Sequence, residues 1–252
     1  MPTRSNVSTD RDLQDTIISY LSDANLRRQH TPDLPISSEQ ASRAHKFARF
    51  LARRYYRDRL VRSFRYSPLF RNVIGCTAED VVETVAFDAF LDECVLGSLI
   101  SAERVAEIAK EFLLAPTQPF PWWTDLLEYE AAFSLQAATA ETGAPATVPR
   151  KGLSALMRRF AWNLPELLPK LRSREPISDD LQTAVDLLFS RTREGRIYAV
   201  QVEDATKAAF QETDGVRTAD EIANALGMSA ESCSSILTSL AQIGAVVMPL
   251  HT

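Results

Sequence analysis

A change in hydrophobic periodicity near residue 184 divides this sequence into two parts. Before it, apolar residues recur every three to four positions, which is the spacing of amphipathic helices. After it, two short segments, 184–189 and 197–202, follow the alternating pattern of strands. The chain has only 8 glycines in 252 residues, too few for the many tight turns of an all-β fold. We therefore expect a mainly α protein with a small α+β module at its C-terminal end.

The part before this change predicts a helical domain over 1–140. Residues 140–152 are small and include prolines, and 153–171 carries apolar residues at helical spacing. We therefore expect a linker and a bridging helix over 141–175. The helices of the first domain are expected, between short connectors, near 11–28, 38–63, 78–99, 102–114 and 122–138.

The last part, 176–252, predicts a winged-helix-like module. The two alternating segments are joined by a short turn at 192–195, which indicates a hairpin. Thr218 and Ser229 are suited to cap helices, and Gly227 and Gly244 are suited to end them. After the hairpin we expect three helices and a short extended segment, at 203–212, 218–226, 229–242 and 245–248.

The reactive residues that most enzymes and metal sites need are scattered in this sequence. The histidines, and likewise the cysteines, lie more than four positions apart, so the pairs typical of metal sites are missing. We expect no catalytic residue, no metal site and no cofactor in this chain. The N-terminal segment is polar, and no apolar stretch is long enough for a membrane span, so a cytoplasmic protein is expected.

Charge is distributed very unevenly. Residues 43–71 contain ten basic residues and one acid, a net charge of +9, whereas 72–141 has a net charge of −11. The basic segment could bind a partner protein, bind nucleic acid, or pack against the acidic helices of its own domain. If it binds a partner, we expect the docking residues to be Arg53, Arg54, Tyr55, Tyr56, Arg57, Tyr66, Trp122 and Trp123.

One stretch resembles a known family. Residues 214–223 read DGVRTADEIA, and Leu226 and a further helix that ends near Gly244 follow them. This pattern is similar to the PqqD-like domains called RiPP recognition elements, which bind precursors of ribosomally synthesised and post-translationally modified peptides. The resemblance covers about 184–248.

The helical domain in front of this module extends the resemblance. It is rich in arginine and tyrosine, as in Tyr55-Tyr56-Arg57 and in 64–67. The whole chain therefore resembles the partner proteins of multinuclear non-heme iron-dependent oxidative enzymes, such as those of methanobactin and 3-thiaglutamate synthesis. The resemblance implies a non-catalytic subunit that forms a heterodimer with the enzyme. It also implies that the iron lies in the enzyme, which modifies a cysteine of the precursor peptide.

In recognition elements the peptide joins the strand just before the first module helix, which here is 197–202. An edge strand has unpaired backbone N–H and C=O groups that an extended peptide can satisfy. A proline at Val200 is expected to remove one such donor and weaken peptide binding. The expected peptide-binding residues lie on this strand and on the inward side of 229–242: Ile197, Tyr198, Val200, Val202, Cys233, Leu237 and Leu240.

The alternative is a winged-helix DNA-binding transcription regulator with 229–242 as its recognition helix. That segment contains no lysine or arginine. Because contacts to phosphate dominate the affinity of proteins for DNA, a recognition helix without a cation is unfavourable. The sequence therefore favours a peptide over DNA as the ligand, and no nucleic-acid partner is expected.

Overall fold

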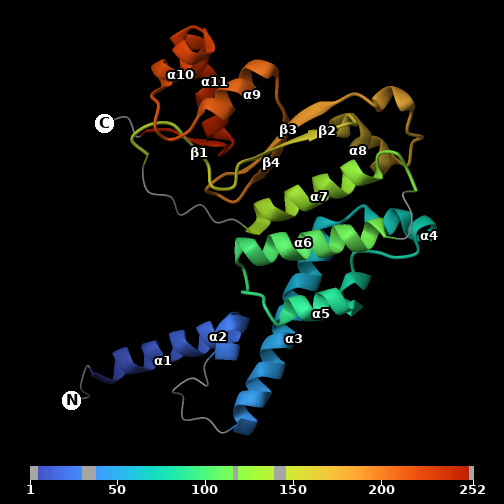
Figure 1. Ribbon diagram of the computed structural model, residues 1–252, viewed down its shortest axis with the longest axis vertical. Helices are drawn as coiled ribbons and strands as arrows, with labels where there is room; N and C mark the ends of the chain where they lie inside the picture. The colour runs from blue at the N-terminus through green and yellow to red at the C-terminus, as the bar shows by residue number, and fades with distance from the viewer. Residues whose placement is uncertain (1–4, 30–37, 116–118, 139–145, 250–252) are drawn as a thin grey trace. The chain divides into compact units, whose positions relative to one another are not determined.

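The computed structural model describes residues 5–29, 38–115, 119–138 and 146–249 (Figure 1). These residues form mainly helices, with five short strands, which confirms the expected mainly α class. The chain divides into two compact units, 1–117 and 118–252. The domain boundary expected near residue 140 therefore falls inside the second unit. In that unit, the helix α7 (Trp123–Ala138), which precedes residue 140, contacts the sheet.

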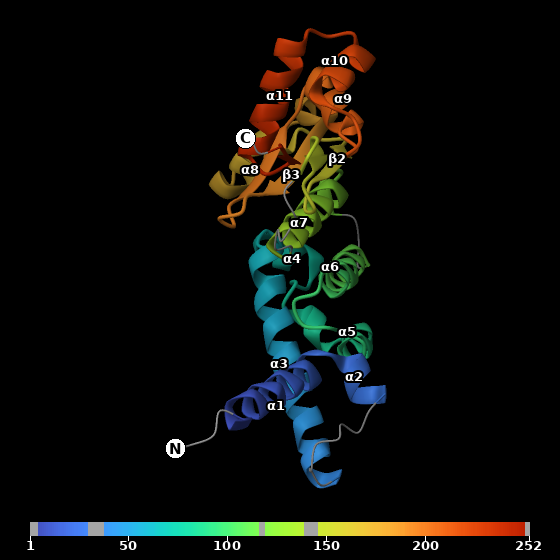
Figure 2. The same ribbon diagram turned by 90° about the vertical axis from the view of Figure 1, so that its left-hand side faces the viewer.

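The first unit is helical. Its α-helices are α1 (Ser5–Ser22), α2 (Ala24–Gln29), α3 (Ser38–Ser63), α4 (Arg71–Ile74), α5 (Val85–Leu91) and α6 (Leu99–Leu114). Two short 3₁₀ helices, η1 (Ser67–Phe70) and η2 (Asp80–Glu83), lie on either side of α4. In Figures 1 and 2, α1 and α2 lie beside the N-terminal half of α3, and α5 and α6 lie beside its C-terminal half.

Two expected helices of this unit are interrupted. The continuous helix expected over 78–99 is wrong, because Thr84 has an extended backbone and its hydroxyl accepts a hydrogen bond from the Phe87 N–H to begin α5. The helix expected over 11–28 breaks at Asp23, whose side chain accepts a hydrogen bond from the Asn25 N–H. Local capping therefore outweighs the apolar periodicity at both places.

The core of the first unit forms along one face of α3. Buried residues recur at every fourth position of this helix, at Ala48, Ala52, Tyr56 and Leu60, and the row continues with Phe64 directly after the helix ends. The Tyr56 and Phe90 rings meet edge to face, with centroids 4.9 Å apart, which joins α3 to α5. Because the buried residues repeat every four positions, they lie on one face of α3, and the opposite face does not contribute to this core.

The second unit is mixed. Its helices are α7 (Trp123–Ala138), α8 (Leu164–Ser173), α9 (Asp204–Glu212), α10 (Ala219–Leu226), α11 (Ala230–Gln242) and the 3₁₀ helix η3 (Asp179–Leu181). Its strands are β1 (Arg150–Lys151), β2 (Leu156–Phe160), β3 (Val185–Arg191), β4 (Ile197–Gln201) and β5 (Val246–Val247). Strands β2, β3 and β4 form an antiparallel sheet in that order, and β1 pairs with β5.

The hairpin and the three helices that follow it are confirmed as β3–β4 and α9–α11. Thr218 and Glu221 form a capping box at α10, and the Ser229 hydroxyl caps α11. The helix expected over 153–171 is wrong in its first part, because residues 156–160 pair with β3 as strand β2. Only the later part is helical, as α8.

The three-stranded sheet is covered on both faces. On one face, Leu188 packs in a core with Phe210 of α9, Ile222 of α10 and Leu237 of α11. On the other face, the Phe189 ring lies 5.4 Å from the Tyr129 ring of α7, centroid to centroid. Figures 1 and 2 show α9–α11 and α7 on opposite sides of the strands.

The end of α11 approaches the β3–β4 turn very closely. The Ser190 hydroxyl donates a hydrogen bond of 2.8 Å to the Ile243 carbonyl oxygen. Gly244 follows with a φ of +77°, and a Cβ atom at this position would lie 2.3 Å from the Arg191 carbonyl oxygen. Glycine is therefore required here both by the backbone conformation and by the lack of space.

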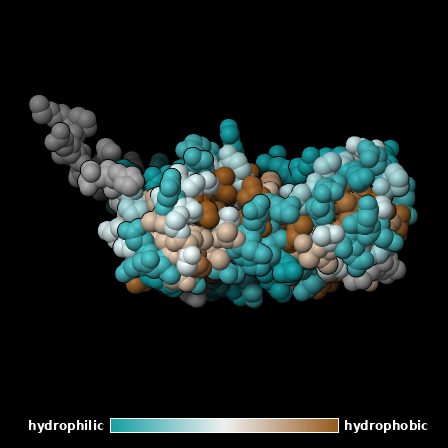
Figure 3. All heavy atoms as spheres, turned by 90° about the horizontal axis from the view of Figure 1, so that it is seen from above, coloured by the Kyte–Doolittle hydropathy of each residue, from teal (hydrophilic) through white to brown (hydrophobic). Residues whose placement is uncertain are grey.

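The outer surface agrees with internal cores in both units. On the face seen in Figure 3, hydrophobic residues form small groups separated by hydrophilic ones. None of the described helices combines the length and the apolar character that crossing a lipid bilayer requires.

Candidate peptide-binding and partner-binding surfaces

Strand β4 lies at an edge of the sheet, since β3 is its single neighbour among the described strands. At one end of the β3–β4 ladder, the Val202 N–H donates a hydrogen bond to the Asp186 carbonyl oxygen. At the other end, the Thr192 N–H donates one to the Arg196 carbonyl oxygen. Because backbone groups alternate along an antiparallel strand, Tyr198 and Val200 also direct theirs toward β3. The free edge therefore presents the N–H and C=O groups of Ile197, Ala199 and Gln201.

The two edges of this sheet differ in charge. Strand β2 carries exposed Arg158 and Arg159, whereas β4 contains no charged residue. Charged side chains on an edge strand disfavour pairing with another chain, and an uncharged edge permits it. Of the two edges, β4 is the one suited to accept an added strand.

The residues expected to bind the peptide fall into two groups. Ile197, Tyr198, Val200 and Val202 are partly buried on β4 or just after it. By contrast, Cys233, Leu237 and Leu240 are buried in the core beneath α11, and burial raises the pKa of the Cys233 thiol. This is a correction: those three side chains stabilise the unit and are not free to line a pocket for a guest peptide.

The basic helix α3 pairs with acidic residues of its own unit. Arg49 forms ion pairs with Asp88 and Asp92, and Arg53 pairs with Asp88 as well. Arg53 also donates a hydrogen bond of 2.5 Å to the Val82 carbonyl oxygen. Arg57 pairs with Glu79, and this hydrogen bond raises the pKa of Arg57. Arg49, Arg53 and Arg57 therefore pair with acidic residues of their own unit.

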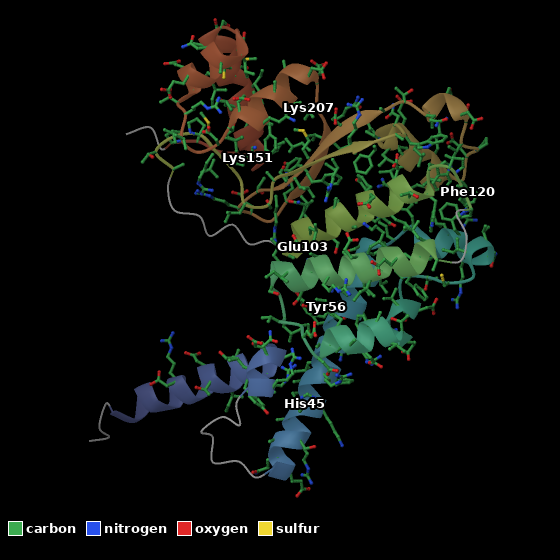
Figure 4. All side chains as sticks on the ribbon, viewed as in Figure 1. His45, Tyr56, Glu103, Phe120, Lys151 and Lys207 are labelled. Atoms are coloured by element: carbon green, nitrogen blue, oxygen red, sulfur yellow. The ribbon has the colours of Figure 1, made fainter. Side chains whose placement is uncertain are left out.

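Most of the aromatic residues expected at a docking face are buried. Tyr56, Tyr66, Trp122 and Trp123 have at most 5% of their surface exposed. Tyr56, labelled in Figure 4, donates a hydrogen bond to the Val95 carbonyl oxygen, and burial raises its pKa. This corrects the expected docking set, in which only Arg54 and Tyr55 are both exposed and free of an acidic partner among the described residues.

We expect charge reversal of Arg53 and Arg57 together, as Arg53→Glu/Arg57→Glu, to destabilise the first unit. Each pair is partly exposed and screened by solvent, so replacing attraction with repulsion should lower the stability of the unit only modestly. Hydrogen exchange over residues 49–95 is the measurement. Tryptophan fluorescence is the internal control, since all three tryptophans lie in 118–252 and their unfolding curve should not change.

Adding Glu79→Arg to the double variant restores one pair of opposite sign and should recover part of the protection. Unchanged hydrogen exchange in the double variant would show that these ion pairs do not hold the unit together.

No three His, Cys, Asp or Glu side chains of the described residues lie close enough together to hold a metal ion. The expectation that the chain needs no metal stays a prediction. No protein-family model matches the chain, and no curated protein matches its sequence. The function proposed below therefore rests on the chain's own residues and on the resemblance of 214–223 to recognition elements.

Proposed function

We propose that this chain is a non-catalytic partner subunit in the biosynthesis of a ribosomal peptide natural product. It binds the precursor peptide and presents a cysteine of that peptide to a separate iron-dependent oxidative enzyme, with which it forms a heterodimer. The iron belongs to the enzyme, and this chain contributes recognition and positioning.

The observation that carries this proposal is the uncharged edge strand β4, directly followed by α9. In the family that residues 214–223 resemble, the peptide joins the strand at this position. Backbone hydrogen bonds to Ile197, Ala199 and Gln201 would supply affinity, and side-chain contacts on alternate positions would supply selectivity.

The two faces of an added strand would meet different surroundings. The partly buried Val200 packs against the core formed with α9–α11, and Tyr198 lies two positions before it on the same face. Ile197 and Ala199 lie on the opposite face, toward α7. A guest peptide with apolar residues at alternate positions would continue both layers.

The ladder fixes which proline substitution tests this proposal. Val200→Pro removes a donor that faces β3, so it should disrupt the hairpin, contrary to the expectation from sequence. Ala199→Pro instead removes an outward donor and leaves the β3–β4 ladder intact. Leaving one carbonyl oxygen of the guest peptide without a partner costs about 1–3 kcal/mol, so the affinity should fall roughly 10- to 100-fold.

If the gene's neighbourhood encodes a short cysteine-containing peptide, calorimetric titration with that peptide measures the effect. Ala199→Val is the matched control, because it keeps the N–H and should bind like the parent chain. An unchanged affinity in a folded Ala199→Pro protein would contradict peptide binding at β4. A genomic neighbourhood with neither such a peptide nor an iron-dependent oxidative enzyme would contradict the wider role.

A further inference from the structure

The side of α3 that faces away from the core carries a second pattern of exposed residues. Phe47, Phe50 and Val61 have 52%, 57% and 43% of their surface exposed. Arg43 and Arg54 are exposed on the same side of the helix. We call these five residues the outer stripe: Arg43, Phe47, Phe50, Arg54 and Val61.

The outer stripe follows helical geometry. Its members are separated by three, four or seven positions, the spacing that keeps residues on one face of an α-helix. The buried row that includes Ala48, Ala52 and Tyr56 lies on the opposite face. From Arg43 to Val61 the stripe is about 27 Å long, since an α-helix rises about 1.5 Å per residue.

The charges of the outer stripe are available to a partner. Arg54 forms no ion pair with any described residue of the chain. Arg43 pairs with Glu39 one turn away, and both side chains are about three-quarters exposed. An exposed pair of this kind contributes little, so it can be exchanged for a pair with another molecule. Two aromatic side chains that are about half exposed thus lie between cationic ones.

We infer that the outer stripe binds an amphipathic helix of the partner protein, with its apolar side on Phe47 and Phe50 and with acidic residues along its flanks. A straight, narrow and partly apolar surface matches one face of a helix. The arginines at positions 43 and 54 complement acidic flanks. The inference deepens the proposed function, on which it rests for the existence of a partner protein.

Nucleic acid fits this surface less well. The exposed carboxylates of Asp88, Asp92 and Glu79 lie beside α3, where they pair with Arg49, Arg53 and Arg57. A phosphate backbone carries negative charge along its whole length and would be repelled by these acids, whereas the proposed helix contacts the stripe mainly through apolar side chains.

The test uses a synthetic 22-residue helical peptide with leucines at helical spacing and glutamates on its flanks, labelled for fluorescence anisotropy. We expect the full chain to bind it, and Phe47→Ser/Phe50→Ser to weaken binding at least roughly 10-fold, because buried aromatic anchors dominate such contacts. Arg54→Glu should weaken binding and lower its salt dependence.

The matched control is Val85→Ser/Ile100→Ser, which removes two apolar side chains that are even more exposed but lie outside α3. This control should bind like the parent chain. Circular dichroism should find both double variants as helical as the parent.

Other results would overturn the inference. A lysine-flanked version of the peptide that binds equally well would remove the role of charge. Binding of a single-stranded oligonucleotide in place of the peptide would assign the stripe to nucleic acid. Self-association of the parent chain that is lost in Phe47→Ser/Phe50→Ser would assign it to a second copy. None of these results changes the calorimetric titration with the precursor peptide, which measures binding at β4. Failure of the inference about the stripe can therefore be distinguished from failure of the proposed function.

Discussion

Gly244→Ala should destabilise the protein more than the same exchange at any other described glycine that has a left-handed backbone. The added Cβ would lie 2.3 Å from the Arg191 carbonyl oxygen and 3.1 Å from the Thr192 Cα, both of them backbone atoms. A left-handed backbone costs a non-glycine residue about 1 kcal/mol, and the clash adds to this because α11 must move away from β3. We expect a total loss of roughly 3–5 kcal/mol.

Urea unfolding followed by tryptophan fluorescence measures this loss, since all three tryptophans report on residues 118–252. Gly227→Ala is the matched control: Gly227 has a φ of +65° and also ends a helix, but no atom lies within 4 Å of its added Cβ. It should cost only about 1 kcal/mol. Equal losses in the two variants would mean that α11 does not approach β3 as described.

Phe189→Ala is the second large effect that we expect. Phe189 lies on the central strand, is fully buried and contacts both Tyr129 of α7 and Phe160 of β2. Its truncation leaves a cavity between the sheet and α7, and such changes cost about 3–5 kcal/mol. The midpoint of the tryptophan unfolding transition should fall accordingly.

Leu153→Ala is the control for Phe189→Ala, because it truncates an apolar side chain of the same unit that is 61% exposed. Its effect on stability should stay within about 0.5 kcal/mol. If Phe189→Ala were equally mild, then α7 would not be packed on β3, and the division of the chain after residue 117 would be wrong.

The elements that the sequence predicts well are those with local signals. Strands β3 and β4 are joined by a short turn, and α10 and α11 begin at the capping residues Thr218 and Ser229. Each signal lies within a few positions of the element that it specifies. The end of α10 at Gly227 is equally local, since this residue adopts the left-handed conformation.

Strand β2 lacks such a signal. Residues 156–160 form a strand because they pair with β3, which is far away in the sequence. Apolar spacing alone cannot distinguish a short strand from the start of a helix in such a segment. The same limit applies to the division between units, because only tertiary contacts place α7 with the sheet.

For the candidate sites, the sequence predicts the strand and not the accessibility of its surroundings. Tyr55 and Tyr56 are neighbours, yet a rotation of about 100° around α3 leaves one exposed and buries the other. The signal was available, since Tyr56 falls four positions after Ala52 and four before Leu60. The excess charge of 43–71 could not disclose which arginines pair internally, because Asp88 and Glu79 approach α3 only in the folded unit.

The pairing of β1 with β5 determines when the second unit can be completed. These are the first and the last strands of the unit, and the Gly152 N–H also donates to the Ala245 carbonyl oxygen. During synthesis on the ribosome, the three-stranded sheet emerges before β5 does, so the pairing of β1 with β5 is among the last contacts that can form. Because contacts between residues so far apart form slowly, the nascent unit passes through a stage in which β4 is already paired but the unit is still open.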